Sequence, residues 1–431
     1  MGGVTSRLAG FHRLGLAERR GMVSRMLGLS PADAGALEGT GGLGVEVANE
    51  MIENAVGVFH LPLGLGLNLK VNGRDYIVPM AVEEPSVVAA VSFAAKMARA
   101  AGGFTADADE ALMIGQVQVA GAKDPEAAAA ALRANKAPLL ELANSFHPNL
   151  VKRGGGARDI EVRVLPAPDG RGEPLLVLHL IIDTQEAMGA NLINTMAEGV
   201  APFVEQVTGG RVRLRILSNL ADRRLARASC RIPVEALADF GLDGAQIAEG
   251  IVEASRFAEA DPYRAATHNK GVMNGVDSVA IATGQDWRAI EAGAHAFACR
   301  GGRYGPLSTW RLEDGYLVGR IELPLALGVV GGPIRLHPQV QAALRILRVQ
   351  SARELAMVMA SVGLAQNLAA VRALGSVGIQ RGHMALHARS VAVTAGAQGE
   401  QVEAVASLLV AAGQVKVDKA REILAALQNR A

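Results

Sequence analysis

The run MIGQVQVAG at residues 113–121 is the first of four strand-like segments that decide the fold. Three further strand-like runs follow along the chain: ARDIEVRVLP at 157–166, PLLVLHLIID at 174–183 and RVRLRILS at 211–218. Helical patterns fill the two longer gaps, at 124–148 and 187–207. The order strand, helix, strand, strand, helix, strand is that of a ferredoxin-like unit, and it predicts one between about residues 110 and 218.

The segments on either side of this unit share another pattern, of predicted hairpins followed by helices. The unit is therefore interpreted as an insertion. Before it, LGLNLKVNGRDYIVPM at 65–80 predicts a hairpin that turns at Asn72-Gly73. After it, TWRLEDGYLVGRIELPLALG at 309–328 predicts a second hairpin that turns at Asp314-Gly315. Helical patterns at 338–375 and three further helices up to residue 431 complete the chain.

Composition excludes several classes of protein. Half of the 431 residues are hydrophobic and the net charge is +1, which argues against a nucleic-acid groove or a polybasic membrane surface. No apolar run reaches the ~20 residues of a membrane helix, and the N-terminus has no continuous hydrophobic segment of a signal peptide. The two cysteines, Cys230 and Cys299, are too few for a disulfide framework and lack metal-ligand spacing. We expect a cytoplasmic protein.

Candidate chemistry concentrates in DPYRAATHNKGVMNGVDSVAIATGQDWRAIEAGAH, residues 261–295. Lys270 lies between Asn269 and Gly271, and Asp286 precedes Trp287. A lysine and an aspartate held together in apolar surroundings shift each other's pKa, as proton transfer requires. A structural ion pair would contain the same two residues, so both interpretations stay open at this point.

Other candidates have alternatives too. Glu83 and Glu84 end a strand and precede an Ala-rich helix that we expect to start at Pro85. Either glutamate is a candidate acid, or a helix N-terminus simply prefers acidic residues. His383 and His387 stand four apart, but the glutamate of the zinc-peptidase pattern is missing, so no metal site is predicted. A histidine there is a candidate proton donor to a leaving group or an ordinary surface residue.

The residues Met188 to Asn191 occupy a predicted strand-to-helix junction. Small residues there allow an anionic ligand to approach the helix N-terminus, or they allow the helix to pack closely on the sheet. The glycine fingerprint of a Rossmann domain is absent, because Leu69 stands where the third glycine after Gly64 and Gly66 is required. A dinucleotide would therefore bind on another fold.

Six motifs together resemble one known family. They are ENAVG at 53–57, EEPSVVAA at 83–90, EAMGAN at 186–191, DPYRAATHNKGVMNG at 261–275, TGQDWRAIEAGAH at 283–295 and GHMALHAR at 382–389. In this order, over nearly the whole chain, they resemble the bacterial, class II type of 3-hydroxy-3-methylglutaryl-coenzyme A reductase. The resemblance implies a reversible four-electron reductive deacylation of 3-hydroxy-3-methylglutaryl-CoA to mevalonate and coenzyme A with two NAD(P)H and no metal.

The resemblance also implies roles for individual residues. The catalytic residues would be Glu84, Lys270, Asp286 and His383. Those that bind or position the substrate would be Ser86, Arg264 and Asn274. The nicotinamide nucleotide would contact Glu186, Met188, Gly189, Ala190 and Asn191. A cation such as Lys270 near the carbonyl suits this chemistry, because each reduction develops negative charge on the carbonyl oxygen.

Two departures from the family pattern concern the nucleotide. Glu186 replaces the usual aspartate at the head of its motif, so the nucleotide contact there would differ from that of the family. NADH-preferring members have an acid that holds the adenosine ribose, whereas His147 stands at that place here, near Lys152 and Arg153. An acid would repel a 2′-phosphate and a base would attract it, so NADPH or use of both nucleotides is favoured over NADH alone.

The expected architecture is α+β: a discontinuous large α/β domain around a central helix, an inserted ferredoxin-like cofactor domain and a C-terminal helical flap. The expected boundaries are 1–110 and 219–377 for the large domain, 111–218 for the insertion and 378–431 for the flap. We expect a homodimer or a higher oligomer of dimers with a shared active site. The alternatives are a mainly oxidative, mevalonate-degrading enzyme that uses NAD, and a non-catalytic relative that binds coenzyme A.

Overall fold

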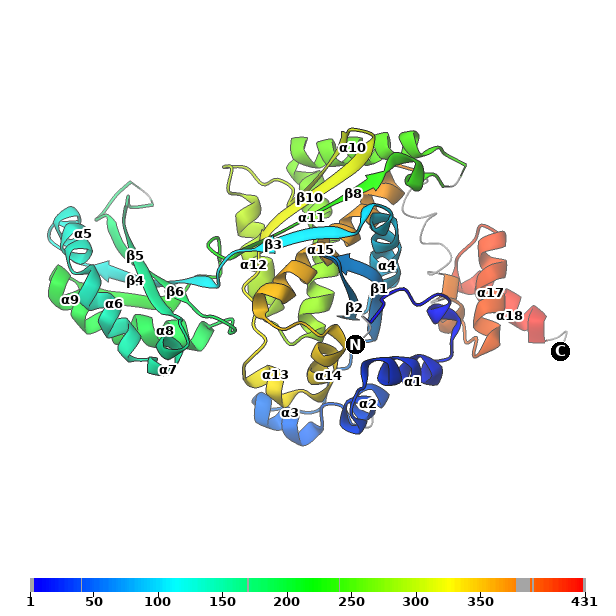
Figure 1. Ribbon diagram of the computed structural model, residues 1–431, viewed down its shortest axis with the longest axis horizontal. Helices are drawn as coiled ribbons and strands as arrows, with labels where there is room; N and C mark the ends of the chain where they lie inside the picture. The colour runs from blue at the N-terminus through cyan, green and yellow to red at the C-terminus, as the bar shows by residue number, and fades with distance from the viewer. Residues whose placement is uncertain are drawn as a thin grey trace.

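The computed structural model describes residues 4–39, 41–168, 170–239, 241–376, 388–389 and 391–428. Its strands form two separate sheets, one of six strands and one of four. Figure 1 shows the four-stranded sheet at one end of the molecule and the six-stranded sheet in the middle. At the other end lie α17 (Glu400–Ala411) and α18 (Val417–Gln428), which have an apolar cluster of their own. The predicted α+β class is confirmed.

The larger sheet consists of β1 (Leu63–Val71), β2 (Arg74–Ala81), β3 (Phe104–Ala108), β8 (Leu225–Pro233), β9 (Ser308–Glu313) and β10 (Tyr316–Pro324). Its order is β2-β1-β3-β8-β10-β9, with β1 parallel to β3 and the other neighbours antiparallel. Both predicted hairpins are confirmed. At their turns φ is positive at both residues, 48° and 83° at Asn72-Gly73 and 50° and 78° at Asp314-Gly315, as a tight two-residue turn requires.

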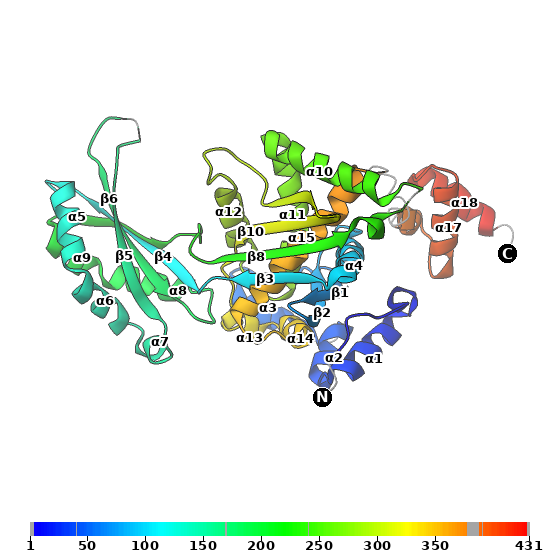
Figure 2. The same cartoon turned by 45° about the horizontal axis from the view of Figure 1, so that its top comes forward.

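The smaller sheet consists of β4 (Leu112–Ala120), β5 (Gly156–Leu165), β6 (Leu175–Asp183) and β7 (Arg211–Leu217). Its antiparallel order is β5-β6-β4-β7, the ferredoxin-like arrangement of the predicted segment. The chain leaves the larger sheet after β3 and returns as β8, and these two strands pair with each other (Figure 2). The domain boundaries at 110, 218 and 377 stay a prediction.

Two helices predicted beside the smaller sheet are each broken. In place of one helix at 124–148 there are α5 (Pro125–Ala134), α6 (Lys136–Ser145) and α7 (Pro148–Lys152); in place of the second there are α8 (Ala190–Gly199) and α9 (Ala201–Thr208). Pro138 and Pro202 have no N–H to donate to the carbonyl four residues earlier, so an uninterrupted helix would lose a bond and clash at each. The prediction of single helices was wrong for this reason.

The helix α15 (Ala352–Leu374) lies at the centre of the larger unit, against the six-stranded sheet and three helices: α4 (Val87–Ala98), α10 (Gly244–Ala260) and α11 (Pro262–Ala282). Among the described residues it is the one helix long and apolar enough to cross a membrane, but 78% of its most apolar window is buried inside the protein. It is therefore the expected central helix, and a core element.

The crossing of α11 on α15 depends on two glycines. A Cβ on Gly275 would lie 2.8 Å from the Cβ of Gln366 and 3.0 Å from the Val362 carbonyl oxygen. A Cβ on Gly363 would lie 2.9 Å from Cγ2 of Val276. The glycines of the 261–295 stretch thus do not break α11, and Gly275 lets its backbone approach α15 closely.

The remaining elements are helices and 3-10 turns outside the two sheets. They are η1 (Phe11–Arg13), α1 (Leu16–Leu27), α2 (Pro31–Glu38), α3 (Val45–Met51), η2 (Arg99–Ala101), η3 (Val234–Leu237), α12 (Trp287–Ala298), α13 (Gly332–Leu336) and α14 (Pro338–Leu347). The N-terminal ones share a small apolar cluster with β2 and α14, built on Phe11, Val23, Ile77 and Ile346. This cluster attaches the N-terminal segment beside β1.

A pair of carboxyl groups on α11 and α12 makes stability depend on pH. Burial, and then the hydrogen bond with Glu291, raise the pKa of Asp277 from 3.8 to about 8. As pH rises between these values the unfolded chain has already lost the proton that the folded chain retains. Stability therefore falls across this window, by at most about 1.4 kcal/mol per pH unit.

We expect Asp277→Asn, which keeps a donor towards Glu291 and removes the titration, to gain stability relative to the parent as pH rises. Urea unfolding at about pH 5 and about pH 8 measures the difference. Asp418→Asn, whose side chain is 93% exposed, is the control. If the difference in unfolding free energy between Asp277→Asn and the parent is the same at both pH values, the raised pKa of Asp277 is contradicted.

Candidate active site

An ion pair between Glu84 and Lys270 joins the loop after β2 to the middle of α11. Lys270 Nζ lies 2.7 Å from Glu84 Oε2, and Asn274 Nδ2 donates to the same oxygen over 3.4 Å. Lys270 and Asn274 are four residues apart, so one face of α11 presents both. The side chains of Lys270 and Glu84 are 60% and 41% exposed, which leaves the pair open to a ligand. These three candidates from the sequence lie together.

Ser86 is the N-cap residue of the helix that follows Glu84, and its backbone conformation is unusual. Its φ is 79°, in the left-handed region, and its Oγ is buried without a hydrogen-bond partner. Both features cost free energy and typically persist where a ligand or a reaction uses them. The helix α4 begins at Val87 rather than at Pro85, so the predicted start was two residues early.

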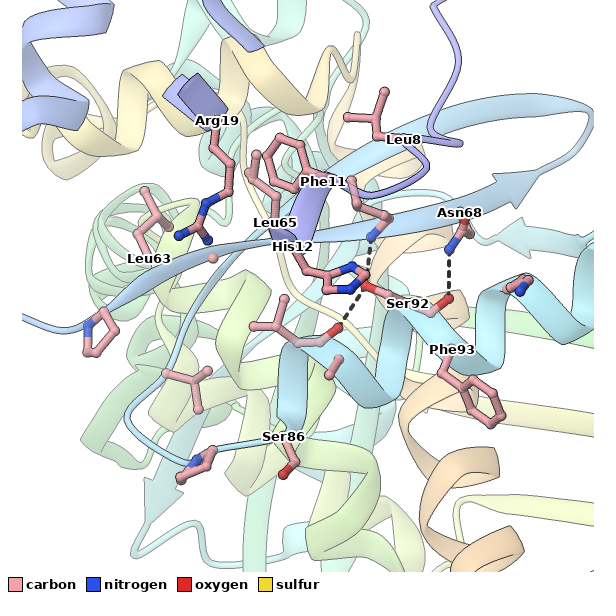
Figure 3. Close-up of a pocket in the computed structure, with 18 of the residues that line it drawn as sticks. Leu8, Phe11, His12, Arg19, Leu63, Leu65, Asn68, Ser86, Ser92 and Phe93 are labelled. Carbon is pink, nitrogen blue, oxygen red and sulfur yellow. Dashed lines mark hydrogen bonds between the residues drawn. The ribbon is translucent and has the colours of Figure 1, made fainter. Parts of the chain in front are cut away.

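A pocket of about 1040 Å³ extends from Glu84 and Ser86 between β1 and α4 to the N-terminal segment. Four basic side chains line it: Arg7, His12, Arg19 and Lys96. Figure 3 shows His12 and Arg19 reaching into it from the N-terminal segment, with Ser86 at its far end. A concave surface with several cationic groups suits a ligand that carries several phosphates.

These basic residues were not among the sequence candidates. Arg7, His12 and Arg19 stand close together in the sequence, which is a weak signal of an anion site. Their connection to Glu84 depends on the apolar cluster that attaches the N-terminal segment beside β1, and no local pattern reports that contact.

Asp286 does not pair with Lys270, contrary to the expectation from the sequence. It is the N-cap of α12, where Oδ1 accepts from Ala289 N over 3.1 Å and lies 3.7 Å from Arg288 Nη2. No hydrogen bond or ion pair joins it to Lys270 in the described part of the chain. The reason is length, since α11 continues from Lys270 to Ala282, about 18 Å of helix. Within one chain, Glu84 is the partner of the lysine.

Two other candidates also lie apart from this pair. Arg264 is six residues before Lys270, so its side chain points about 120° away around α11. It has no side-chain partner among the described residues, and burial lowers its pKa. His383, like His387, falls outside the residues that the structure describes, so its predicted role is untested.

The turn from β6 to α8 carries the predicted nucleotide motif. Gly189 has a φ of 101°, and a Cβ there would lie 2.4 Å from Thr184 Cγ2, so the turn packs closely on itself at this glycine. No side chain caps the N-terminus of α8, so its first N–H groups remain available to an anion. His147, the other residue predicted near the nucleotide, is the N-cap residue of α7 but makes no side-chain capping bond. Its Nε2 is buried without a hydrogen-bond partner.

Glu186 makes a contact that the sequence did not predict. Its Oε2 accepts from Ala352 N, the first residue of α15, over 2.6 Å. A carboxylate at this place satisfies one free N–H group and complements the helix dipole. The predicted contact of Glu186 with a cofactor stays a prediction, while its carboxylate holds the turn to the central helix.

The comparisons with known proteins all find one family. A family model described as hydroxymethylglutaryl-coenzyme A reductase matches residues 15–388. A 3-hydroxy-3-methylglutaryl-coenzyme A reductase of Archaeoglobus fulgidus is 49% identical, covering 99% of this chain and 96% of the relative. The structure is similar to that of the reductase from Streptococcus pneumoniae, with a TM-score of 0.83, 46% identity, and coverage of 97% of this chain and 99% of that chain.

A second structure has a bound nucleotide. It is the class II reductase from Streptococcus pneumoniae bound to NADPH in open conformations, with a TM-score of 0.82 and 48% identity. The match covers 85% of this chain and 99% of that chain. Sequence and structure therefore point to the same family.

The contact of Glu186 predicts a loss of stability on its removal. Glu186→Ala leaves the N–H of Ala352, a buried residue, without its acceptor, and we expect a loss of about 1 kcal/mol in the free energy of unfolding. Glu186→Gln retains an acceptor and should lose less. Urea unfolding measures both, with the exposed Glu198→Ala of α8 as control. A loss no greater than that of the control would show that this bond does not support the fold.

Proposed function

The chain belongs to the hydroxymethylglutaryl-coenzyme A reductase family and is an NAD(P)H-dependent oxidoreductase, and on that basis we propose that it converts 3-hydroxy-3-methylglutaryl-CoA to mevalonate and coenzyme A. The Glu84–Lys270 pair at the end of the basic pocket is the observation that carries the proposal. Neither alternative, a mainly oxidative enzyme or a non-catalytic relative, is favoured over the reductase.

The reaction consists of two reductions. In the first, a hydride adds to the thioester carbon, the carbon–sulfur bond breaks, and the departing thiolate takes a proton. In the second, a hydride adds to the resulting aldehyde carbon and the alkoxide takes a proton. The bound nicotinamide nucleotide supplies one hydride in each reduction, so two reduced nucleotides and two protons are consumed.

Lys270 and Glu84 would act on the reacting oxygen. Each hydride addition develops negative charge there, and an ammonium group that already points into the site stabilises it without reorganisation. Glu84, 2.7 Å from that ammonium, would reach the same oxygen and, in its protonated form, would donate the proton. Asn274 would hold the Glu84 carboxylate in place, and Ser86, with its unpaired Oγ, would bind a polar group of the substrate.

Two further residues complete the assignment. His383 of the C-terminal segment would protonate the coenzyme A thiolate, which leaves more easily as a thiol. Arg264, half-buried and without a side-chain partner among the described residues, would bind the free carboxylate of the substrate.

The basic pocket would take the phosphates of coenzyme A. Its opening at Glu84 and Ser86 puts the thioester end of such a ligand beside Lys270, and its basic side chains line the opposite end. The volume, about 1040 Å³, is large enough for an extended cofactor of this kind. The interior between these ends is apolar, with Phe11, Leu63 and Leu65 on its walls.

The turn at Met188 to Asn191 would bind the nicotinamide nucleotide. The uncapped N-terminus of α8 suits a phosphate. Near His147, the bases Lys152 and Arg153 favour a nucleotide with a 2′-phosphate. We therefore propose a preference for NADPH over NADH.

The separation of Asp286 from Lys270 supports an active site shared between two copies of the chain. Asp286 would join the Glu84–Lys270 pair from a second subunit of a homodimer, where it would tune both groups. With Cys230 and Cys299 free, we propose that the dimer works in the cytoplasm.

Replacement of Lys270 tests the mechanism. We expect Lys270→Met to lower kcat with 3-hydroxy-3-methylglutaryl-CoA by at least about a hundredfold, because the charge on oxygen loses its cation. Nicotinamide absorbance follows the reaction, with NADPH and NADH in turn and with mevalonate plus coenzyme A in reverse. The exposed Lys123→Met is the control. Turnover near the parent level in Lys270→Met would refute the role of the lysine.

Mixed dimers test the shared site. Lys270→Met and Asp286→Asn should each be inactive alone, while their co-expressed mixture should regain up to about a quarter of the parent activity, because half of the dimers contain one intact site. A mixture of Lys270→Met and Glu84→Gln should stay inactive, since these two residues pair within one chain. No recovery in the first mixture would mean that Asp286 acts within its own chain.

A further inference from the structure

A buried arginine connects the nucleotide turn to the larger sheet. Arg224, which is 6% exposed, donates from Nη1 to Thr184 Oγ1 and to the Ala187 carbonyl oxygen, both over 3.1 Å. From Nη2 it donates to the carbonyl oxygen of Leu327, three residues after the end of β10, over 2.6 Å. One guanidinium therefore holds the turn before α8 and the end of β10 together.

The charge of this arginine is unusual in its surroundings. Its hydrogen bonds within the described residues all go to uncharged oxygens, while Glu186 and Asp183 act on it through space. Burial lowers the pKa of Arg224 to about 10. A buried cation is costly, and the two carboxylates offset only part of the burial here, beside a turn that would hold phosphates. Its field favours an anion at that turn.

Gln285 makes a second connection, from the residue before Asp286. Its Nε2 donates to the carbonyl oxygens of Thr283 and Gly328, and its Oε1 accepts from Gly328 N, each over 2.8 Å. The side chain is buried, so these bonds have no competition from water. The amide thus fixes the loop of Asp286 to the backbone of Gly328.

Gly328 in turn contacts the nucleotide turn directly. A Cβ on Gly328 would lie 2.8 Å from Met188 N and 3.2 Å from the Glu186 carbonyl oxygen, which accepts from Val329 N over 3.0 Å. Asp286 and Met188 are therefore connected through Gln285 and Gly328 without a gap. We call Arg224, Gln285 and Gly328 the joint.

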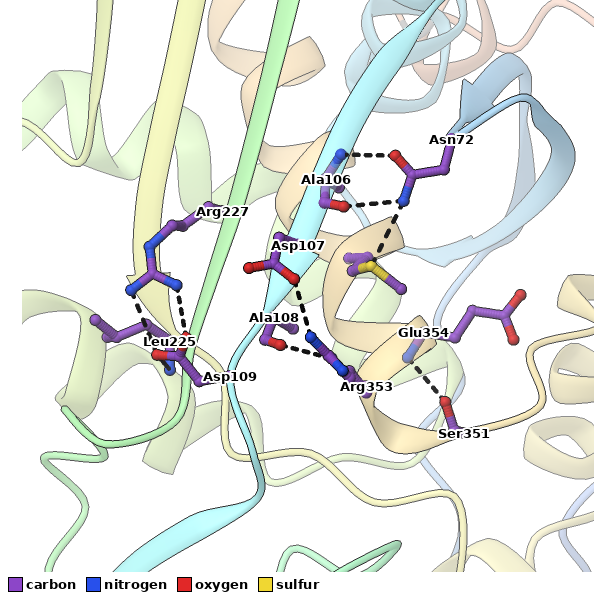
Figure 4. Close-up of polar contacts among 11 residues, drawn as sticks. Asn72, Ala106, Asp107, Ala108, Asp109, Leu225, Arg227, Ser351, Arg353 and Glu354 are labelled. Carbon is purple, nitrogen blue, oxygen red and sulfur yellow. Dashed lines mark hydrogen bonds and ion pairs between the residues drawn. The ribbon is translucent and has the colours of Figure 1, made fainter.

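The two strands of the larger sheet from which the chain crosses to the smaller sheet, β3 and β8, are braced separately. Asp109, after β3, accepts from Arg227 of β8 over 2.7 Å, and Arg353 of α15 donates to the Ala108 carbonyl oxygen over 2.6 Å (Figure 4). These contacts resist separation of β3 and β8. They do not touch the turn at Met188, whose position relative to Asp286 depends on the joint together with the bond from Ala352 N to Glu186.

We propose that Arg224 and Gln285 are positioning residues that set the nucleotide turn, residues 186–191, relative to the loop of Asp286. The reaction uses two nucleotides in succession, so the turn must release one and receive the next in the same place. The directional hydrogen bonds of the joint would return the turn to the same position after each exchange of nucleotide. This inference rests on the proposed roles of Met188 to Asn191 and of Asp286.

Three substitutions in the full-length protein test the joint: Arg224→Met, Arg224→Lys and Gln285→Met. The dissociation constant of NADPH comes from nicotinamide fluorescence, and KM and kcat come from the reductase reaction. We expect Arg224→Met to weaken NADPH binding at least about tenfold, and Gln285→Met to raise the KM for NADPH and lower kcat about threefold or more. The KM for 3-hydroxy-3-methylglutaryl-CoA should stay within about twofold, because its pocket is elsewhere.

Arg224→Lys separates a specific role from general stability. A lysine retains the charge and reaches some of the same oxygens, so it should recover part of the NADPH affinity. The neighbouring Arg223→Met, whose side chain is 48% exposed, is the matched control and should leave both nucleotide constants unchanged. Lower thermal midpoints with unchanged NADPH constants in the folded protein would reduce the joint to a structural contact and overturn the proposal.

Two more variants complete the test. The double variant Arg224→Lys/Gln285→Met should raise the dissociation constant of NADPH by less than the product of the two single fold-changes, since both substitutions loosen one joint. A fold-change equal to that product would refute a single joint. Asn191→Ala tests the nucleotide site itself, separately from the joint. If Asn191→Ala leaves NADPH binding unchanged, the proposed nucleotide site is wrong. If it weakens binding and the joint variants do not, the site stands and the joint fails.

Discussion

The close crossing of α11 on α15 is the constraint on which the site depends. Gly275 and Gly363 lie at this crossing, and any side chain at either position would meet atoms within 3 Å. The same helix α11 also contacts β2 and α4. That contact brings Lys270 and Asn274 to Glu84 from a segment 186 residues away. The chemistry of the site therefore depends on the absence of two side chains.

The two sheets divide the remaining work. The larger one, with its central helix, positions the Glu84–Lys270 pair and a basic pocket, and the smaller one presents an uncapped helix N-terminus. Reduction by a nucleotide needs these surfaces at a constant separation, because the reacting atoms tolerate little displacement. Buried polar bonds are well suited to this, since they are directional where apolar contacts are not.

Much of the fold follows from local patterns. Asn72-Gly73 and Asp314-Gly315 specify their hairpins because few other residues adopt a positive φ at both turn positions. The alternation of strand and helix patterns was enough for the ferredoxin-like order. Helix boundaries follow less directly from such patterns. Hydrophobic spacing alone predicted one continuous helix at each place, whereas Pro138 and Pro202 divide them into shorter helices. Pro85 likewise lies outside the helix that it was expected to begin, because Ser86 adopts a left-handed conformation.

For the site, the sequence by itself determined the kind of chemistry, because motif order along the chain identifies the family and names Glu84, Lys270 and Asp286. Tertiary structure alone decided which of them pair. Lys270 contacts Glu84 and not Asp286, since the length of α11 separates the two residues that lie closer in sequence. The partners of Arg224, Gln285 and Glu186 likewise depend on contacts between distant segments, which no local spacing encodes.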